Sequence, residues 1–188
     1  MATNDRGREF EQAALVHLDR VFQLALRLCG NRAEAQDLAQ ETFLRAFRHF
    51  DQFDPGTNCR AWLFAILRNT FINRVKRQGR ELLGLEDGAS ERREGESSEM
   101  TAAIASPEEE FFRHVVDSDV LAALERLPLS FREVVLLADV EECSYKEIGQ
   151  ICGLPLGTVM SRLFRGRQML RQALVAAGRE RRGIGREA

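Results

Sequence analysis

Four short signals, each a small polar residue followed three positions later by a glutamate, constrain the fold of this chain most strongly. They begin at Asn31, Ser106, Ser130 and Ser144. In such a signal, the first side chain accepts a hydrogen bond from an unpaired backbone N–H at a helix start, and the glutamate reaches back to the capping residue. Each signal precedes a stretch with apolar residues at helical spacing, and no stretch alternates apolar and polar residues as a half-buried strand does. The pattern predicts an all-α fold.

The apolar spacing predicts three helices in the N-terminal half of the chain, at 8–28, 32–49 and 60–78. Residues 51–59 contain a Pro-Gly pair and short polar residues, so we expect a loop there. The expected inner face of the first helix consists of Leu15, Leu18, Phe22 and Ala25. The expected inner face of the second helix consists of Ala35, Leu38, Ala39, Thr42, Phe43, Ala46 and Phe47. In the C-terminal half, the expected helices lie at 107–116, 119–126, 131–140, 145–152 and 155–177.

Residues 81–105 differ in composition from both halves. They hold seven acidic residues against two basic ones and few large apolar side chains. Such a segment has little with which to build a core, so it favours a flexible tether. We therefore predict two small helical domains, at 8–80 and 106–178, joined by a flexible acidic linker at 81–105.

Charge is distributed unevenly along a chain whose net charge is only −2. Residues 55–80 hold six basic side chains and no acid, and residues 148–179 hold five arginines and no acid. Two such segments in an otherwise acid-rich chain favour contact with phosphates over merely solvated helix faces. The N-terminus is polar and no apolar run approaches the ~20 residues of a membrane span, so we expect a cytoplasmic protein.

The sequence carries no constellation typical of catalysis. It lacks a glycine-rich phosphate loop, a Gly-x-Ser-x-Gly turn and a His-Glu-x-x-His pair. Its cysteines and histidines are scattered without metal-ligand spacing. We therefore expect a chain that is not an enzyme, holds no metal and needs no cofactor, with cysteines that serve as buried or semi-exposed thiols. These cysteines are Cys29, Cys59, Cys143 and Cys152.

The segment 144–170 has the pattern of a helix-turn-helix, with two short periodic stretches on either side of a Gly-Leu-Pro turn. Arginine on the outer face of such a helix can chelate guanine in the major groove. We predict contact with duplex DNA; the alternative is a charged helix pair that only faces solvent. The buried face is expected to consist of Val159, Leu163 and Leu170, packed on Ile148 and Ile151. The outer face is expected to consist of Thr158, Ser161, Arg162, Phe164 and Arg165.

The third expected helix mixes aromatic, amide and basic side chains. Aromatic rings beside cations can stack unpaired bases, and asparagine can bind a base edge, so the mixture favours contact with single-stranded DNA. Helical spacing also demands apolar residues, and for Trp62, Phe64 and Phe71 we favour a place in the core. Phe53 and Asn58 fall in the preceding loop and are freer to meet a ligand.

Three separate motifs resemble the bacterial extracytoplasmic-function RNA polymerase sigma factors of the sigma-70 family. They are DLAQETFLRAF at 37–47, RAWLFAILRNTFIN at 60–73 and GTVMSRLFRGR at 157–167. The likeness extends from about residue 10 to 177, with the motifs in the family's order and separation. The resemblance implies promoter-specific transcription initiation in a stress response. Within the family, 70–73 and 137–141 are most similar to the group that answers thiol-oxidative stress.

The resemblance also implies a role for each domain. Residues 8–80 would be sigma region 2, which binds core polymerase and melts and recognises the −10 element, and residues 106–178 would be region 4, which recognises the −35 element. The loop 53–59 would capture a flipped non-template base, and Met160 stands where many relatives carry a base. The family's polymerase-docking positions fall on Asp37, Gln40 and Glu41. Its −10 positions fall on Phe53, Asn58, Arg60, Asn69, Asn73 and Arg74. Its −35 positions fall on Thr158, Ser161, Arg162, Phe164, Arg165 and Arg167.

The partners implied by the resemblance are core RNA polymerase, promoter DNA and an anti-sigma factor. Polymerase would be bound through the coiled coil of its largest subunit and through its flap, and the acidic linker would thread its active-site and RNA-exit channels. An anti-sigma factor would hold the chain inactive; in the thiol-stress group this inhibitor is a small zinc-binding protein. We expect a monomer when the chain is free.

Two other classes of protein stay open from the residues alone. A stand-alone helix-turn-helix regulator would bind a palindromic duplex site without polymerase, while its N-terminal domain senses a signal or dimerises. The motif at 37–47 favours the sigma factor over this regulator. A zinc or redox enzyme would need a ligand spacing that the sequence lacks, and metal analysis of the purified protein tests it.

Overall fold

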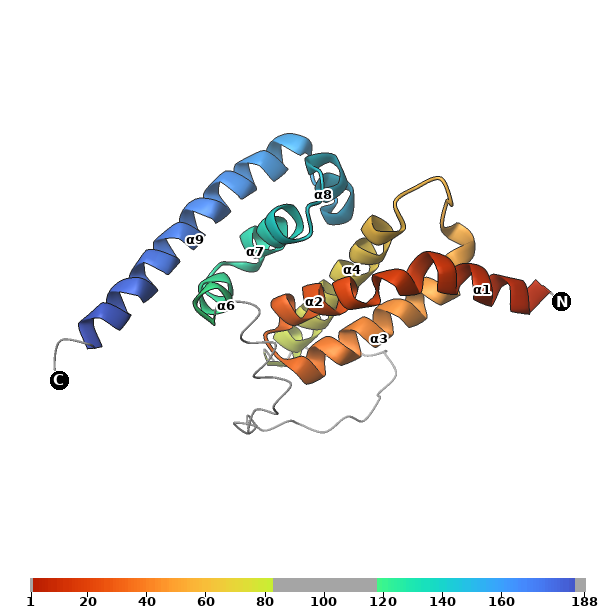
Figure 1. The fold of residues 1–188 in the computed structure, drawn as a ribbon, viewed down its shortest axis with the longest axis horizontal. Coiled ribbons are helices and arrows are strands. Elements are labelled where there is room, and N and C mark those ends of the chain that lie inside the picture. The colour runs from red at the N-terminus through yellow and green to blue at the C-terminus, as the bar shows by residue number, and fades with distance from the viewer. Residues whose placement is uncertain (1, 83–117, 185–188) are drawn as a thin grey trace.

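The computed structural model describes residues 2–82 and 118–184, and the side chains within 6–80 and 120–176. These residues form helices and turns without any strand among them, which confirms the predicted all-α fold (Figure 1). In the described ranges, no helix is both long enough and apolar enough to cross a lipid bilayer.

The N-terminal domain is built from helices α1 to α4. Helix α1 (Ala2–Ala14) continues through a 3₁₀ turn (Leu15–His17) into α2 (Leu18–Cys29), and α3 (Arg32–Arg48) returns along α2. A second 3₁₀ turn (Phe50–Gln52) and a loop lead to α4 (Cys59–Leu82). Helix α4 therefore extends two residues into the expected linker, and the rest of that linker, 83–105, lies outside the described residues.

The C-terminal domain consists, within the described residues, of α6 to α9. Helix α6 (Ser118–Glu125) precedes α7 (Leu129–Val135), which passes into a π-helical turn (Leu136–Val140). Helix α8 (Tyr145–Cys152) has the predicted bounds, and α9 (Leu156–Ile184) runs beyond the predicted end at 177. The helix expected at 107–116 and its capping signal at Ser106 lie outside the described residues.

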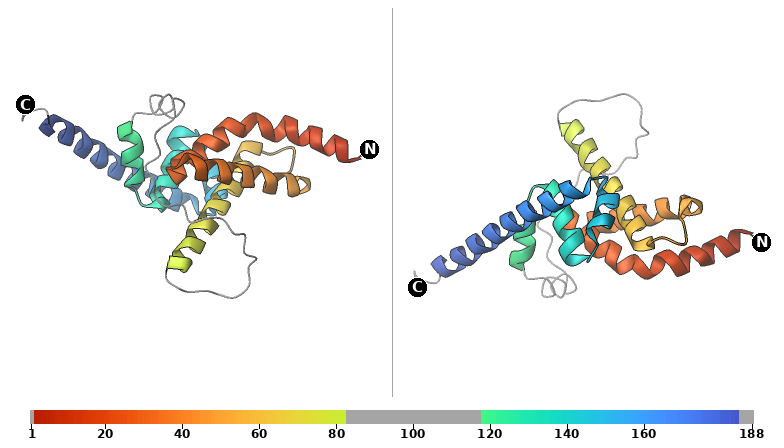
Figure 2. Two further views of the ribbon diagram at one scale, coloured as in Figure 1. Left: turned by 90° about the horizontal axis from the view of Figure 1, so that it is seen from below. Right: turned by 90° about the horizontal axis from the view of Figure 1, so that it is seen from above.

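The two domains pack against each other. Helix α9 lies along α6, α7 and α8, and Figure 1 shows α7 and α8 between α9 and the N-terminal helices. Helix α8 contacts α4, and the two further views show the same neighbourhood from opposite sides (Figure 2). A single cluster of buried apolar side chains includes members of both domains, among them Leu24, Leu63 and Leu67 on one side and Val134, Ile148 and Val159 on the other.

The predicted inner face of the first helix was largely wrong. Leu15 and Leu18 are 43% and 48% exposed, and only Ala25 of the four expected residues is fully buried. The helix carries two neighbouring apolar stripes, and the core covers the other one. The buried stripe consists of Phe10, Ala14, Val21, Leu24, Ala25 and Leu28. The inner face predicted for the second helix is confirmed except at Phe47, which is 43% exposed.

Two of the four capping signals are confirmed and one is wrong. The Asn31 side-chain oxygen accepts from the Glu34 N–H at 3.2 Å. Ser144 and Glu147 form a complete capping box, in which the Ser144 N–H donates to Glu147 Oε2 at 2.8 Å and the Glu147 N–H donates to Ser144 Oγ at 3.3 Å. Ser130 caps nothing, because α7 already begins at residue 129 and the glutamate three positions after Ser130 is buried against another helix.

Candidate nucleic-acid interface

The helix-turn-helix forms as predicted from α8, a tight turn and α9. The turn begins at Gly153, whose φ of 63° lies in the left-handed region that glycine enters without steric cost. Val159 and Leu163 of α9 are buried together with Ile148 and Ile151 of α8. This packing fixes the angle at which α9 leaves the turn, so its outer face is presented by a rigid support.

A close helix contact orients α9 further along. A Cβ placed on Gly166 would lie 2.7 Å from Val135 Cγ2 and 3.4 Å from the Phe131 Cβ. Only glycine allows α9 to approach α7 this closely, since real side-chain atoms do not come within 3.0 Å. The contact holds the first turns of α9 against the domain and leaves the opposite face open.

Four of the residues predicted to contact the −35 element are exposed, namely Ser161, Phe164, Arg165 and Arg167. Phe164 is wide open, with 73% of its surface accessible. An exposed apolar ring can contact the thymine methyl group in a major groove, and an exposed arginine beside it can bind guanine. Thr158 is half-buried, and its carbonyl oxygen accepts a hydrogen bond from Ser161 Oγ at 3.0 Å.

The other two predicted −35 arginines are held by carboxylates of the C-terminal domain. Arg162 is half-buried, with Nη1 3.5 Å from Glu133 Oε1. Arg167 makes a two-pronged contact with Asp139, from Nε at 3.0 Å and from Nη2 at 2.5 Å. Both side chains therefore have to exchange a carboxylate partner for phosphate or base before they can contact DNA.

The loop between α3 and α4 presents aromatic and amide groups at one end of the N-terminal domain. Phe53 stacks on Phe50 with ring centroids 5.8 Å apart and packs against Trp62 at 5.2 Å. Asn58 Oδ1 accepts from the Ala61 N–H at 3.3 Å and so helps to start α4. Phe64 is fully buried, and Trp62 and Phe71 are partly buried against the core, which confirms the core assignment for these three.

Helix α4 carries the remaining residues predicted for the −10 element, but they do not share one face. Asn69 and Asn73 are exposed and one turn apart, so they present two amides side by side. Arg60 is half-buried, with its guanidinium 6.0 Å from the centre of the Phe64 ring. Arg74 turns toward α3 instead, and Nη2 is 2.5 Å from Glu41 Oε2.

The three predicted polymerase-docking residues lie on α3. Asp37 and Gln40 are exposed, as expected for a docking face. Glu41 is half-buried; burial opposes its ionisation, but hydrogen bonds and charges from Arg74 and Arg45 hold the pKa of its carboxyl below the ordinary value. Glu41 therefore stays ionised and braces α3 against α4.

An apolar groove runs beside these docking residues. It encloses about 640 Å³ between the α1–α2 rod and α3, and Gln40 forms part of its wall. Its exposed apolar members include Leu15, Leu18, Leu44 and Phe47. The second apolar stripe of the first helix, which the core leaves uncovered, thus ends up in this groove. A concave apolar surface rimmed by polar residues is typical of a protein interface.

Residues predicted to bind DNA also lie at the contact between the two domains. Glu133 of α7 is buried and accepts from Arg68 of α4 through Nε at 2.7 Å and Nη2 at 3.1 Å. Asn58 Nδ2 donates to Glu147 Oε1 of α8 at 2.6 Å. The acids in these pairs belong to the C-terminal domain, and their partners belong to the basic segment of the N-terminal domain. The C-terminal carboxylates thus occupy part of the basic segment that was predicted to contact phosphates.

Glu141 extends the same pattern. It is only 2% exposed, and its two oxygens lie 3.7 Å from Arg20 and 3.6 Å from Arg27 of α2. Burial raises the pKa of the Glu141 carboxyl, and nearby arginines only partly oppose this. Oε2 has no hydrogen-bond partner among the described residues. Neither Glu133 nor Glu141 was predicted to form a buried ion pair, although an acid inside a strongly apolar stretch such as 133–141 is a usable signal of one.

The four cysteines are all free thiols of low reactivity. Burial raises the pKa of Cys29 and Cys143 to about 11 and that of Cys152 to about 12, and it also raises the pKa of Cys59. The thiolate is the reactive form, so these side chains are poor nucleophiles at neutral pH. Their placement agrees with the predicted buried or semi-exposed thiols.

Comparison with known proteins places a recognised region on each domain. Residues 15–81 match the family Sigma-70 region 2, and residues 118–170 match the family Sigma-70, region 4. The ECF RNA polymerase sigma factor SigE of Mycolicibacterium smegmatis is 40% identical over 175 residues. These residues cover 92% of this chain and 65% of SigE, so the chain spans just under two thirds of the length of that relative. SigW of Bacillus subtilis is 32% identical over 85% of each chain. EcfG of Rhodopseudomonas palustris is 38% identical over 83% of this chain and 80% of that protein.

Two solved structures share the fold. The sigma factor RpoE in complex with the anti-sigma factor NepR from Bartonella quintana superposes with a TM-score of 0.69 at 30% identity, covering 89% of this chain and 97% of that one. CnrH in complex with the cytosolic domain of CnrY superposes with a TM-score of 0.62 at 26% identity, covering 90% of each chain. These coverages include both domains of the present chain.

Proposed function

This chain belongs to the ECF RNA polymerase sigma factors, and we propose that it binds core polymerase through its N-terminal domain and selects promoters through both domains. The observation that most supports this is that both regions occur in order on one chain, each on a helical domain with an exposed polar face. The division is 8–80 for polymerase and the −10 element, 81–105 for the linker and 106–178 for the −35 element. Such a factor has no reaction of its own to catalyse. We place it in the cytoplasm because its chromosomal template is there.

Polymerase docks on α3 and the adjoining groove in this proposal. Asp37 and Gln40 supply exposed polar contacts to the coiled coil of the largest subunit, and the apolar groove beside them buries the exposed leucines and Phe47. Glu41 contributes through its ion pairs, since it holds α4 in register with α3. A helix of the partner laid into a groove of this kind gains affinity from buried apolar area.

The −10 element is bound by the loop and α4. Phe53 offers a stacking surface for an unpaired base, and Asn69 and Asn73 offer amides to neighbouring bases. Asn58, Arg60 and Arg74 complete the set as contacts to base or phosphate. Extruding a base costs a few kcal/mol, which stacking in the loop offsets.

The −35 element is bound in the major groove by α9. Ser161, Phe164 and Arg165 make the first contacts because they are already exposed. Thr158, Arg162 and Arg167 join once the two arginines leave their carboxylate partners. The half-buried Thr158 lies at the N-terminal end of α9, where backbone N–H groups also favour a phosphate.

In the free chain, the C-terminal domain covers part of the proposed DNA-binding surface of the N-terminal domain. Glu147 of α8 is bonded to Asn58, and Glu133 of α7 is bonded to Arg68 of the basic segment. Binding of a promoter therefore requires the domains to separate. An anti-sigma factor, by analogy with the RpoE–NepR and CnrH–CnrY complexes, would hold the inactive arrangement. The closer assignment to the thiol-stress group rests on the similarity of residues 70–73 and 137–141 alone. In that case the redox-active thiols would belong to the inhibitor, because burial raises the pKa of the cysteines of this chain and makes them poor nucleophiles.

Run-off transcription tests the proposed function. Purified chain is added to bacterial core polymerase with a pool of genomic promoter fragments. Discrete transcripts that depend on the chain, with shared upstream sequences, are expected. An absence of such transcripts, together with specific duplex binding by the chain alone, would contradict the proposal and favour a stand-alone regulator.

A further inference from the structure

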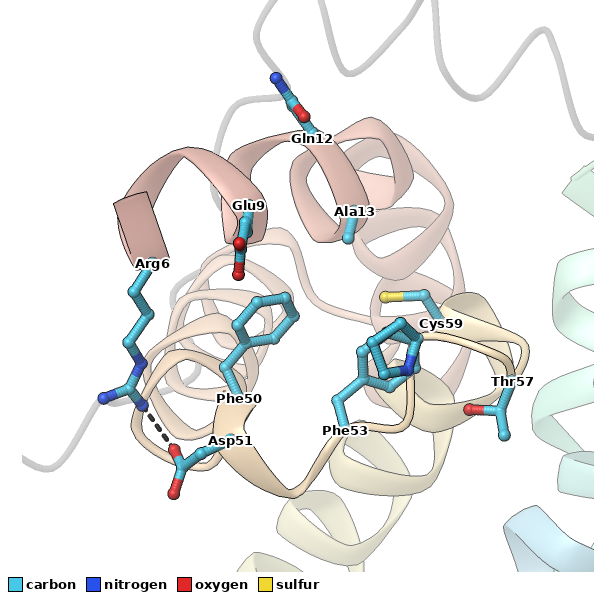
Figure 3. Close-up of a pocket in the computed structure, with 10 residues that line it drawn as sticks. Arg6, Glu9, Gln12, Ala13, Phe50, Asp51, Phe53, Thr57 and Cys59 are labelled. Carbon is cyan, nitrogen blue, oxygen red and sulfur yellow. Dashed lines mark hydrogen bonds and ion pairs between the residues drawn. The ribbon is translucent and has the colours of Figure 1, made fainter. Parts of the chain in front are cut away.

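A pocket lined by both polar and aromatic side chains lies between α1 and the loop that precedes α4 (Figure 3). It encloses about 740 Å³, within the range of small-ligand sites. One wall is the loop proposed to hold a −10 base. The other wall is α1, which precedes the residues 15–81 that match sigma region 2. One wall of the pocket thus belongs to the residues that match sigma region 2, and the other wall is α1, which lies outside that match.

The floor of the pocket is aromatic. Phe50 and Phe53 stack with an angle of 16° between their rings, and Trp62 packs behind Phe53. Phe10 of α1 meets Phe50 edge to face, with centroids 5.2 Å apart, so the helix and the floor are packed together. A flat base can stack on such a platform whatever its identity, which gives affinity without selectivity.

The polar groups on the α1 side differ in their freedom to act. Arg6 donates to Asp51 Oδ1 at 2.7 Å and to the Phe47 carbonyl oxygen at 2.9 Å, so both Arg6 and Asp51 are occupied in anchoring α1 over the loop. Glu9 forms no hydrogen bond or ion pair with any described residue, and Figure 3 shows its carboxylate directed toward the Phe50 ring. Gln12 points away from the floor in the same view. Glu9 is therefore the free polar group above the stacking platform.

A carboxylate accepts hydrogen bonds and donates none. Cytosine, adenine and guanine each offer an exocyclic amino group, whereas the single N–H donor of thymine lies between two carbonyl oxygens that repel a carboxylate. A flipped base is selected through just this edge. We propose that Glu9 is a specificity-determining residue of this pocket, and that it favours a base with an exocyclic amino group over thymine at one position of the −10 element. The inference rests on the proposed sigma function.

The test compares base preference in transcription by holoenzyme. One promoter is prepared with each of the four bases at every −10 position in turn, and run-off transcripts are measured in competition. For the wild-type chain, one position should prefer an amino-bearing base over thymine. In Glu9→Gln, an NH2 donor replaces one carboxylate oxygen and the other oxygen stays an acceptor, so the side chain can also bind the carbonyl oxygens of thymine. The preference for an amino-bearing base at that position should therefore fall about tenfold. Glu11→Gln is the matched control, because this exposed glutamate of α1 is not among the residues that line the pocket.

The possible results distinguish failure of the role proposed for Glu9 from failure of the proposed sigma function. Transcription by Glu9→Gln with unchanged preference at every −10 position overturns the role of Glu9 and leaves the sigma function standing. Equal loss of transcription with all four bases also overturns it, because Glu9 would then support folding or melting rather than selection. Binding of holoenzyme to single-stranded −10 oligonucleotides with each base gives a second measure that does not depend on melting. Absence of any chain-dependent transcript from the wild type overturns both.

Discussion

The contact between Glu133 and Arg68 predicts how tightly the free chain holds itself closed. Glu133 is buried at the domain contact, where Arg68 binds it with two N–H groups and Arg162 approaches it as a second cation. Glu133→Gln keeps the shape but removes the charge, so Arg68 of the other domain loses its counterion in the closed state, whereas in the open state Arg68 is hydrated and loses nothing. Arg162 belongs to the same domain as Glu133, so the loss of its contact is felt in both states and does not shift the equilibrium. The substitution should therefore favour opening.

The size of the effect follows from the burial of the pair. Removing one partner of a fully buried ion pair costs about 3–5 kcal/mol. The Arg68 side chain remains 17% exposed, so water relieves part of the loss. We expect about 2 kcal/mol, in the range for a hydrogen bond to a charged group, which corresponds to roughly a thirtyfold shift toward the open form.

Affinity for core polymerase reports this shift. If only the open form engages polymerase with both domains, the apparent dissociation constant is the intrinsic one divided by the open fraction. Glu133→Gln should then bind core polymerase up to about thirtyfold more tightly in a fluorescence titration, provided that the wild type is mostly closed. Glu142→Gln, at an exposed position of the same domain, serves as the control. Equal or weaker binding by a folded Glu133→Gln protein would refute the reasoning.

Four further substitutions test other parts of the structure. Arg165→Ala should lower transcription from promoters that depend on their −35 element, by about 1–3 kcal/mol in binding, and unchanged promoter preference in run-off assays would contradict its assignment. Asp37→Arg should abolish capture of core polymerase in a pull-down while the circular dichroism spectrum stays the same. Since burial raises the pKa of Glu141, its contribution to the free energy of unfolding is present at low pH and lost as pH rises through the raised pKa, so Glu141→Gln should reduce the drop in melting temperature as pH rises above the ordinary glutamate range. Gly166→Ala should lower the free energy of unfolding by about 1–3 kcal/mol through overpacking, whereas Gly157→Ala, with no neighbour within 4 Å, should not.

Capping residues and apolar spacing predicted the positions of the helices well, because interactions between residues close in the sequence determine where a helix begins and ends. The bounds of α8 follow from a capping box at Ser144 and a left-handed glycine after the last turn, both visible within ten residues. The buried face of α3 was also predicted, except for Phe47, since its small and apolar residues recur at helical spacing. The outer face of the helix-turn-helix followed from the same spacing, and Ser161 and Arg165 are exposed as expected.

The errors share one physical cause, which is that a partner distant in the sequence decides the outcome. Periodicity identifies an apolar stripe but not what covers it, so Leu15 and Leu18 were assigned to a core that lies on the neighbouring stripe. Ser130 and Glu133 have the spacing of a capping box, yet Glu133 pairs with Arg68, 65 residues away. No local pattern contains that information.

The covalent connection between the domains changes what their contact has to achieve. Two groups on one chain meet at an effective concentration set by their connection, so their contact is intramolecular and does not depend on the protein concentration. Carboxylates facing arginines and an asparagine therefore need only weak intrinsic affinity to keep the proposed DNA-binding surface covered. A partner that engages both domains at once has the same advantage and can displace the contact at far lower concentration. In the proposed function, a weak contact of this kind would keep stray nucleic acid from the chain and still be easy for polymerase to open.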